Sequence, residues 1–389
     1  MLEKIKEQFI EAAITLLHAW KKGLKTEEMD EWFQKLNEIA HRSDSLGDNV
    51  CVDDIRDSIG FVCMYLSKDL KDIGDEEFTK YVEDNVLSVR TYHFYYPIYG
   101  LYRFPENIQL GVSNTFMFNS LPEQVQKDFE FIWEHHFEKN TEYAQTVDEY
   151  VSRKKASAFL HLTVVANGSH RAMEKAIRSA EDSVHIIRFL YGLHFPINEC
   201  RYTIEGSKST GGMESYGQHF HGSATYVEFF ACKFPELTEI LIKRDPTVIE
   251  KKLRNALRIF GIQTSITNDQ VRYVLLVTCL ESLLLTGSDR DYILWKLAEK
   301  TALLIGKNKR YINDYVKSAY NKRSAFIHGE YQERNKSLEE KDVGEIEGLV
   351  HGVFWKLMEL KKKGYTEIQK KDDRRSIDEC IEEMKFGKE

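Results

Sequence analysis

The sequence predicts a mainly α-helical protein, with an α+β N-terminal domain followed by a C-terminal antiparallel helical bundle. The chain has 389 residues and only six prolines, and its apolar residues recur mostly at spacings of three and four, as in amphipathic helices. One segment differs. Residues 156–166 are mostly apolar and β-branched and run into Asn167-Gly168, which indicates a strand that ends in a turn. A strand, a turn and a helix in succession favour a mixed α+β arrangement before the bundle.

Residues 1–245 are predicted to form the α+β N-terminal domain, with a regulatory or sensing role. Helices are expected at 3–20, 26–40, 51–69 and 124–138, and strands and loops at 77–121 and 194–235. Ser169 is expected to cap the helix that follows the strand. The predicted buried stripe of that helix consists of Met173, Ile177, Ala180, Val184, Ile187 and Tyr191. Its solvated face is expected to carry Arg171, Lys175, Arg178, Asp182 and His185.

Residues 246–389 are predicted to form the helical domain, because Lys243-Arg244-Asp245-Pro246 interrupts the pattern near residue 245. Its helices are expected at 247–263, 270–287, 288–307, 309–331 and 339–360. Gly306 is expected to terminate the third of these helices and Gly329 the fourth. Short connections between apolar-striped helices predict an antiparallel bundle. The charged tail from Lys361 is expected to be a partly solvated helix or a frayed end.

Composition limits the classes to which this protein can belong. A formal net charge of −8 argues against a protein coated in nucleic acid, because non-specific binding requires positive surface. Residues 301–330 are a local exception, with six basic residues against two acidic ones, and suit either phosphate contact or a solvated helix face. No Cys-x-x-Cys pair occurs, so no metal site or disulfide framework is expected. The chain lacks a signal-peptide pattern and any apolar stretch of transmembrane length, which predicts a cytoplasmic protein without a membrane partner.

Three residues of the C-terminal domain stand out. Glu281 is the lone charge in an apolar run, and a buried carboxylate is costly unless it is paired. Arg323 lies on the apolar stripe of its own helix, so these two residues either pair with each other or face a second copy of the chain. His328 follows Arg323 by five residues, a rotation of about 140° on a straight helix, and therefore points elsewhere.

The segments LESLLLTGSDRDYILWKLAEKTALLIG and VKSAYNKRSAFIHGEY together resemble the Apea-like branch of the HEPN superfamily. The superfamily signature is an Arg with a polar neighbour and a His a few positions on, which corresponds here to Arg323-Ser324 and His328. Tyr320 and Gly329 also fit this branch. The resemblance covers roughly residues 248–360.

The resemblance implies a function. HEPN ribonucleases dimerise, build a joint active site from both copies of the motif, and cut RNA without a metal ion or other cofactor. By that resemblance Arg323 and His328 are the catalytic residues. The supporting and RNA-binding residues are expected to be Ser324, Glu281, Tyr320, Lys317 and Lys322. The chain is then expected to be a homodimeric endoribonuclease for single-stranded RNA in anti-phage defence by abortive infection, with a phage-derived trigger or an antitoxin as a further partner.

The chemistry of RNA cleavage is compatible with these residue types. RNA carries its own nucleophile, the 2′-hydroxyl, so the protein has to move protons and stabilise charge. His moves protons near neutral pH, and the forked donors of Arg suit the charge that develops on the phosphate. The expected product is a 2′,3′-cyclic phosphate, and no cluster of carboxylates is needed.

Plainer interpretations remain open for these residues. Arg323 and His328 also suit the negative end of a helix dipole, and Glu281 also suits a structural ion pair. The whole domain could be a non-catalytic HEPN module that binds RNA or protein, or the toxin of a toxin–antitoxin pair.

Three other motifs are weaker. His219-x-His221 lacks a third metal ligand, and the loop GSKSTGG at 206–212 lacks the order of a phosphate-binding loop. The aromatic run from Tyr92 to Tyr102 is more typical of a core than of a surface that stacks bases.

Overall fold

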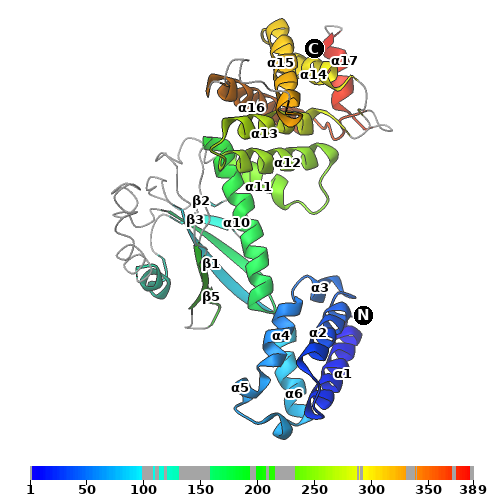
Figure 1. Ribbon diagram of the computed structural model, residues 1–389, viewed down its shortest axis with the longest axis vertical. Helices are drawn as coiled ribbons and strands as arrows, with labels where there is room; N and C mark the ends of the chain where they lie inside the picture. The colour runs from blue at the N-terminus through cyan, green and yellow to red at the C-terminus, as the bar shows by residue number, and fades with distance from the viewer. Residues whose placement is uncertain are drawn as a thin grey trace.

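The computed structural model of the chain describes residues 2–98, 108–109, 114–117, 121–130, 158–192, 199–206, 210–214, 233–286, 289, 292–329, 338, 340–369 and 374–385. These residues are mainly helical, as the sequence predicts. Three parts follow one another along the longest axis: a group of N-terminal helices, a β-sheet with one long helix against it, and a C-terminal group of helices (Figure 1).

The N-terminal helices form a unit with its own apolar core. Among its buried side chains are Phe9, Leu36, Ile55 and Phe78. Its elements are α1 (Leu2–Lys21), α2 (Thr26–Ala40), α3 (Asp44–Gly47), α4 (Val52–Gly60), α5 (Val62–Leu66), a 3-10 turn (Leu70–Asp72), α6 (Asp75–Val82) and a π-helical turn (Glu83–Leu87).

Two predictions for this unit are wrong. The single helix expected at 51–69 is broken at Phe61, which follows Gly60, a poor helix former, and has φ −101° and ψ 14°. The strands and loops expected from residue 77 begin later, because α6 and the π-helical turn occupy the chain up to Leu87. Phe78 and Val82 lie four residues apart and are both buried, so packing of a helical face overrides the strand preference of aromatic and β-branched residues.

The sheet is antiparallel throughout, with strand order β2-β3-β4-β1-β5-β6. At its centre β1 pairs with β4, from Arg90 opposite Ala166 to Ile98 opposite Ala158. The strand predicted to end at Asn167-Gly168 is confirmed as β4. The bounds are β1 (Arg90–Ile98), β2 (Ile108–Gln109), β3 (Asn114–Met117), β4 (Ala158–Ala166), β5 (Glu199–Ile204) and β6 (Thr210–Glu214). A further helical stretch covers residues 123–130 and overlaps the helix predicted at 124–138, whose remaining residues lie outside the described part of the chain.

The long helix α10 (Ser169–Tyr191) lies against one face of the sheet (Figure 1). Alternate side chains of β4, and several of β1, are buried in the core that they share with α10. The small alanine side chains of α10 let the helix approach the sheet closely. Its buried residues there are Ala172, Ala176, Ala180, Val184 and Ile187, so the stripe is displaced from the prediction, and Met173, Ile177 and Tyr191 are only half-buried. His185, predicted on the solvated face, is buried.

The predicted cap of α10 by Ser169 is also wrong. Ser169 is already helical, and the carboxylate of Asp54 in α4 accepts hydrogen bonds from the backbone N–H groups of His170 at 2.8 Å and Arg171 at 3.0 Å. A carboxylate satisfies the free donors of a helix start and suits its positive dipole end. Asp54 therefore ties the N-terminal unit to α10.

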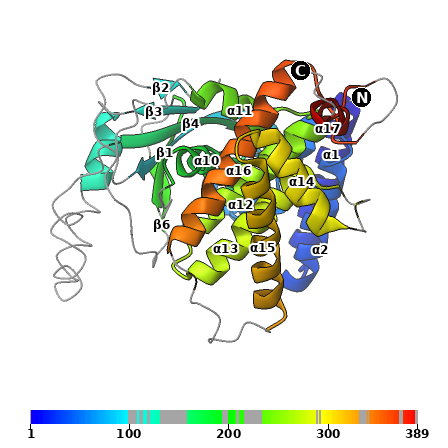
Figure 2. The same ribbon diagram turned by 90° about the horizontal axis from the view of Figure 1, so that it is seen from above.

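The C-terminal helices follow the predicted order and pack against one another as a bundle (Figure 2). Thr247 caps the helix that starts at Val248, and its side chain and that of Glu250 each accept a hydrogen bond from the other's backbone N–H. Gly306, at φ 76°, ends the helix Ile293–Ile305, as predicted. The last helix buries Ile377 and Ile381, so this part of the charged tail is packed. The bounds are α11 (Phe234–Ile242), α12 (Val248–Gln263), α13 (Asp269–Leu284), α14 (Ile293–Ile305), α15 (Lys309–Ile327), α16 (Glu340–Lys362) and α17 (Ile377–Lys385).

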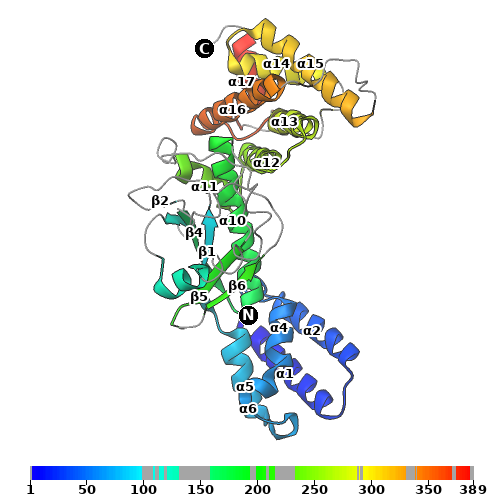
Figure 3. The same ribbon diagram turned by 60° about the vertical axis from the view of Figure 1, so that its left-hand side comes forward.

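The sheet and the C-terminal helices share one apolar core. The boundary predicted near residue 245 falls between α11 and α12, and the buried cluster continues across it from Tyr92 in β1 through Val184 in α10 to Leu257 in α12. Figure 3 shows α10 running from the N-terminal helices along the sheet to the C-terminal helices. In the part of the chain that the structure describes, no helix is both long and apolar enough to span a membrane.

Candidate functional site

The predicted site residues lie on α13 and α15, which pack together in the C-terminal bundle (Figure 2). α15 buries Ile312, Val316 and Ala319 along one face. Arg323 comes four residues after Ala319, so its side chain leaves α15 on the same face. The apolar stripe of α15 therefore directs Arg323 toward α13.

Arg323 meets Glu281 of α13 across this seam. Nη2 of Arg323 lies 3.4 Å from Oε2 of Glu281, and 24% and 17% of the two side chains are exposed. The centre of the guanidinium lies 5.7 Å from the ring centroid of Tyr320. Nε of Arg323 is buried and has no hydrogen-bond partner among the described residues. The guanidinium, which has five donors, is thus held in place without being saturated.

The environment of Glu281 disfavours its charge. Burial raises the pKa of its carboxyl above the ordinary value, and the positive charge of Arg323 opposes this effect without cancelling it. The positive charge of Arg323 therefore stabilises the ionised form of Glu281 in this partly buried position. The pair has the geometry expected if the two residues satisfy each other, one of the two alternatives that the sequence left open.

His328 lies apart from this pair, at the end of α15. It is the C-cap residue, it is exposed, and its backbone N–H donates to the carbonyl of Ser324 at 3.0 Å. Gly329 follows at φ 69°, a left-handed conformation that ends the helix where the sequence predicted. The structure brings Arg323, Glu281 and Tyr320 together, and it leaves His328 facing outward beside the half-buried Ser324.

Lys317, predicted to contact RNA, lies over an exposed aromatic ring. Its Nζ is 3.7 Å from the ring centroid of Trp295 in α14, and 57% of Trp295 is exposed. Tyr292, just before α14, is also exposed and has a positive φ of 58°. Neither aromatic residue was predicted to belong to the site. Trp295 lies three residues before the buried Ala298 and seven before the buried Ala302, so spacing along the helix gave no signal of its exposure.

Lys322, the other predicted RNA contact, is on the opposite flank of α15. Its Nζ lies 3.1 Å from Oδ1 of Asp342 in α16, and the hydroxyl of Tyr315 donates to the carbonyl of the same aspartate. Its charge is therefore paired within the bundle, whereas Lys317 contacts the indole ring of Trp295.

α13 and α15 each carry one exposed aliphatic side chain near the ends that Phe326 and Tyr273 join. The ring of Phe326 packs edge-on against Tyr273, with centroids 6.3 Å apart, which brings the end of α15 to the beginning of α13. Val271 near this start of α13 and Ile327 at the end of α15 are both exposed.

Two lysines hold the other end of α13. Nζ of Lys252 donates to the carbonyls of Ser282, at 2.8 Å, and Leu285, and Nζ of Lys300 donates to the carbonyl of Leu284 at 3.3 Å. Burial and the nearby Lys300 lower the pKa of Lys252 to about 8. These cations satisfy the last carbonyls of the helix and suit its dipole. They therefore fix the turn of α13 that carries Glu281.

Other predicted motifs fall outside the site or outside the described residues. His219 and His221 lie outside the described residues. Of GSKSTGG, Thr210 to Gly212 belong to β6, and the described part of the aromatic run forms β1, where Tyr92, Phe94 and Tyr96 are buried in the core. Among the described residues, no three His, Cys, Asp or Glu side chains are placed to hold a metal ion.

Comparison of the chain with models of protein families, with curated proteins and with solved structures finds no match.

Proposed function

We propose that this chain is a metal-independent endoribonuclease for single-stranded RNA, with Arg323 and His328 as its catalytic residues. The observation that carries the proposal is the guanidinium of Arg323, which is held 3.4 Å from Glu281 while 24% of its side chain stays exposed. Unused donors of a positioned guanidinium suit a phosphate, which binds arginine through paired hydrogen bonds. The HEPN resemblance of roughly residues 248–360 supports the same assignment.

The proposed reaction is an internal transfer at phosphorus. The 2′-oxygen of a ribose forms a bond to the adjacent phosphorus while the bond to the 5′-oxygen of the next nucleotide breaks. One imidazole accepts the proton of the 2′-hydroxyl, and another donates a proton to the leaving 5′-oxygen. Arg323 stabilises the charge that develops on the other phosphate oxygens. The products are a 2′,3′-cyclic phosphate and a 5′-hydroxyl.

Two copies of the chain make this chemistry possible. Arg323 faces the seam with α13, whereas His328 faces outward from the end of α15, so one copy does not point both groups at one phosphate. A second copy placed against this end supplies a second His328. The exposed Val271 and Ile327 are the apolar contacts that such a dimer would bury.

The binding surface for RNA is proposed to include Lys317 and Trp295. A cation over an exposed indole offers both a phosphate contact and a ring on which an unpaired base stacks. The N-terminal unit and the sheet are proposed to restrain the ribonuclease or to sense its trigger. The proposed role in anti-phage defence rests on the HEPN resemblance alone.

The test is cleavage of labelled single-stranded RNA in excess chelator. Wild type is expected to cut and leave cyclic-phosphate ends. His328→Ala is expected to lose about a hundredfold or more in rate, the usual contribution of a general acid or base, and Arg323→Ala a similar factor, the usual contribution of a donor that stabilises developing charge. His18→Ala, which alters an exposed histidine of α1, is the matched control and should cut like wild type. Equal cleavage by His328→Ala would refute the assignment.

Mixing wild type with an excess of His328→Ala tests the dimer. Because the proposed site takes one His328 from each copy, mixed dimers should be inactive, and activity should fall further than dilution with an inert protein would lower it. Light scattering should show a dimer for the wild type. A monomer at every concentration would contradict the shared site.

The alternative is a non-catalytic module that binds RNA. The exposed Trp295 under Lys317 favours it, because this surface can bind without any proton transfer. RNA binding that survives His328→Ala, with no cleavage by any protein in the chelator assay, would favour the binding module over the enzyme.

A further inference from the structure

The N-terminal unit, residues 2–87, meets the rest of the molecule at the first turn of α10 (Figure 1, Figure 3). Its apolar core is separate. Among the described residues, the buried cluster of this unit ends at Leu87, and the cluster of the sheet begins at Tyr92. The chain crosses between them through Ser88 and Val89, and Val89 is 57% exposed. Two bodies that share no apolar core form the kind of contact that opens and closes.

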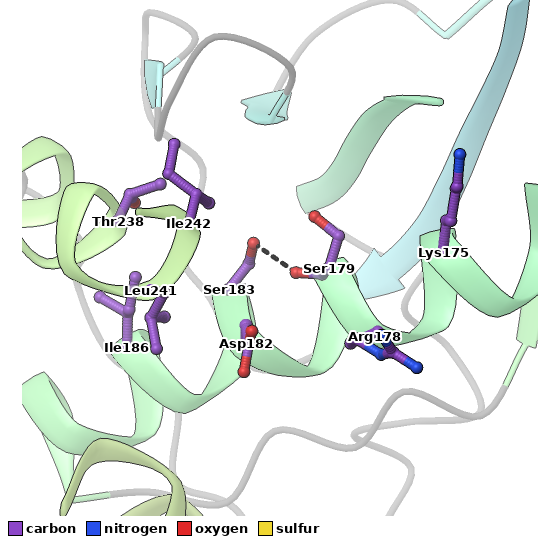
Figure 4. A pocket seen from close by; sticks show the side chains of 9 residues that line it. All are labelled: Lys175, Arg178, Ser179, Asp182, Ser183, Ile186, Thr238, Leu241 and Ile242. Atoms are coloured by element: carbon purple, nitrogen blue, oxygen red, sulfur yellow. Dashed lines mark hydrogen bonds between the residues drawn. The ribbon is translucent and has the colours of Figure 1, made fainter. Parts of the chain in front are cut away.

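Hydrogen bonds make up this contact. The carboxylate of Asp54, which is 4% exposed, accepts from two backbone N–H groups of α10. Nε of Arg171 donates to the carbonyl of Asp48 at 3.0 Å. Lys175, which lines the pocket between α10 and α11 in Figure 4, donates from Nζ to the side-chain oxygen of Asn49 at 2.7 Å. Water can replace the partners in this polar clasp, so its opening costs less than the exposure of an apolar core.

Gly168 lets the two bodies come this close. A Cβ at Gly168 would lie 2.1 Å from both Cγ and Oδ1 of Asp54. The backbone of Gly168 is extended, at φ −129° and ψ 167°, a conformation that every residue tolerates. Glycine is therefore required by the docked Asp54 and not by the backbone at this position. A side chain at residue 168 would push the clasp apart without straining its own turn.

His170 adds a contact that depends on protonation. Its Nε2 lies 2.6 Å from Oδ2 of Asp57 in α4, and about half of each side chain is exposed. Asp53 and Asp54 of α4 add negative charge around the ring, and Arg171 is its cationic neighbour on α10. Burial lowers the pKa of His170, but the hydrogen bond and the charge of Asp57 outweigh this effect and raise the pKa above its ordinary value.

Protonation of His170 therefore strengthens the clasp. The docked His170 has a higher pKa than a free histidine, whose pKa is 6.5. The extra stability of the docked form is thus complete below pH 6.5 and is lost as the pH rises through the raised pKa. A neutral His170 leaves Asp57 with a weaker partner beside two further carboxylates.

We infer that the N-terminal unit is a hinged body, which docks on α10 when His170 is charged and swings about Ser88 and Val89 when the clasp opens. The structure is the closed form. In the open form the backbone N–H groups of His170 and Arg171 lose Asp54 as their acceptor and meet solvent. This movement does not depend on the proposed ribonuclease activity.

The experiment is hydrogen exchange of the full chain, read by mass spectrometry on peptides that cover His170 and Arg171. Their backbone N–H groups are protected while Asp54 accepts from them and exchange when the clasp opens. After correction for the intrinsic rate, protection is expected to fall about fivefold between about pH 6 and about pH 8.5, the scale of one exposed ion pair.

His170→Gln tests the role of the imidazole. Glutamine keeps a hydrogen-bonding side chain that cannot titrate, so the pH dependence of the protection is expected to disappear. His18→Gln is the matched control, because His18 pairs with Asp75 at 2.9 Å inside the N-terminal unit and is equally exposed. This variant should keep the pH dependence of the wild type.

Gly168→Ala tests the hinge independently of charge. The new Cβ is expected to hold the clasp open at every pH, to lower the protection about tenfold or more, and to increase the radius of gyration in small-angle X-ray scattering. Far-UV circular dichroism should stay unchanged, which distinguishes opening from unfolding. Gly74→Ala is the matched control. Gly74 precedes α6 as Gly168 precedes α10, its backbone is also extended, and a Cβ there meets nothing within 4 Å.

Three results would overturn the inference. The first is equal protection of the wild type at the two pH values. The second is a pH dependence that survives His170→Gln. The third is a Gly168→Ala variant with the protection and the radius of gyration of the wild type.

Discussion

Replacement of Gly261 by alanine tests the contact that joins α10 to α12. A Cβ at this position would lie 2.0 Å from Nδ1, 2.7 Å from Cγ and 3.0 Å from Cβ of His185. Because the crowding reaches Cβ, a flip of the imidazole ring does not relieve it. His185 is 8% exposed and has no free space to enter. The two helices therefore have to separate, or the side chain of His185 has to leave its rotamer.

The expected magnitude combines two opposing effects. Overpacking of a core costs about 1–3 kcal/mol, and a clash of this depth belongs at the upper end of that range. Alanine is better than glycine in a helix by about 1 kcal/mol. Gly261→Ala is therefore expected to lower the free energy of unfolding by about 2 kcal/mol. In a His185→Ala background the clash is absent, and the same substitution should stabilise by up to about 1 kcal/mol.

The assay is urea unfolding of wild type, both single variants and the double variant, followed by circular dichroism. The coupling free energy of the four proteins isolates the contact, because each substitution appears with and without the other. A change of sign in the effect of Gly261→Ala is the expected result. An equal loss in both backgrounds, or no loss in the wild type, would refute the packing of His185 against Gly261.

Three further predictions concern other parts of the molecule. Asp54→Ala should lower the free energy of unfolding by about 1–2 kcal/mol and Asp54→Asn by less, in urea unfolding, because alanine removes the cap of α10. Burial lowers the pKa of His351, stacked on Phe189 at 4.2 Å, to about 4, below its unfolded value of 6.5. Stability present above pH 6.5 is then lost as pH falls toward 4, by up to about 3 kcal/mol, and His351→Phe should lose less over this window. Trp295→Ala should weaken RNA binding about tenfold in a titration with fluorescent RNA, and Trp295→Phe less, with unchanged circular dichroism.

Much of the helical architecture could be predicted from local patterns. The apolar repeats give the positions of α12, α13, α15 and α16, and Gly306 marks the end of α14. These signals are local, because a helix needs an apolar stripe and a residue that ends it. The register of the stripe on α10 was not predictable, because Met173 and Ala172 are both apolar and only the sheet decides which of them is covered.

The candidate site was predictable in part. Glu281 and Arg323 stand out as charges in apolar surroundings, and their ion pair follows from the need to compensate a buried charge. Trp295 was missed because exposure of an aromatic residue depends on how α14 packs. The pairing of Lys322 with Asp342 was missed because it depends on how the successive helices α15 and α16 pack, which spacing along either helix does not give.

The sequence by itself determined the positions of α12 to α16, the strand that ends at Asn167-Gly168 and the residue types of the candidate site, since each of these follows from spacing along the chain. Only the tertiary structure decided which groups meet. Asp54, far from α10 in the sequence, caps that helix in place of Ser169. The core runs across residue 245 because α10 spans the sheet and the bundle. Thr238 lines a pocket only because α11 packs against α10. Contacts of this kind depend on distances in space, which local spacing does not encode.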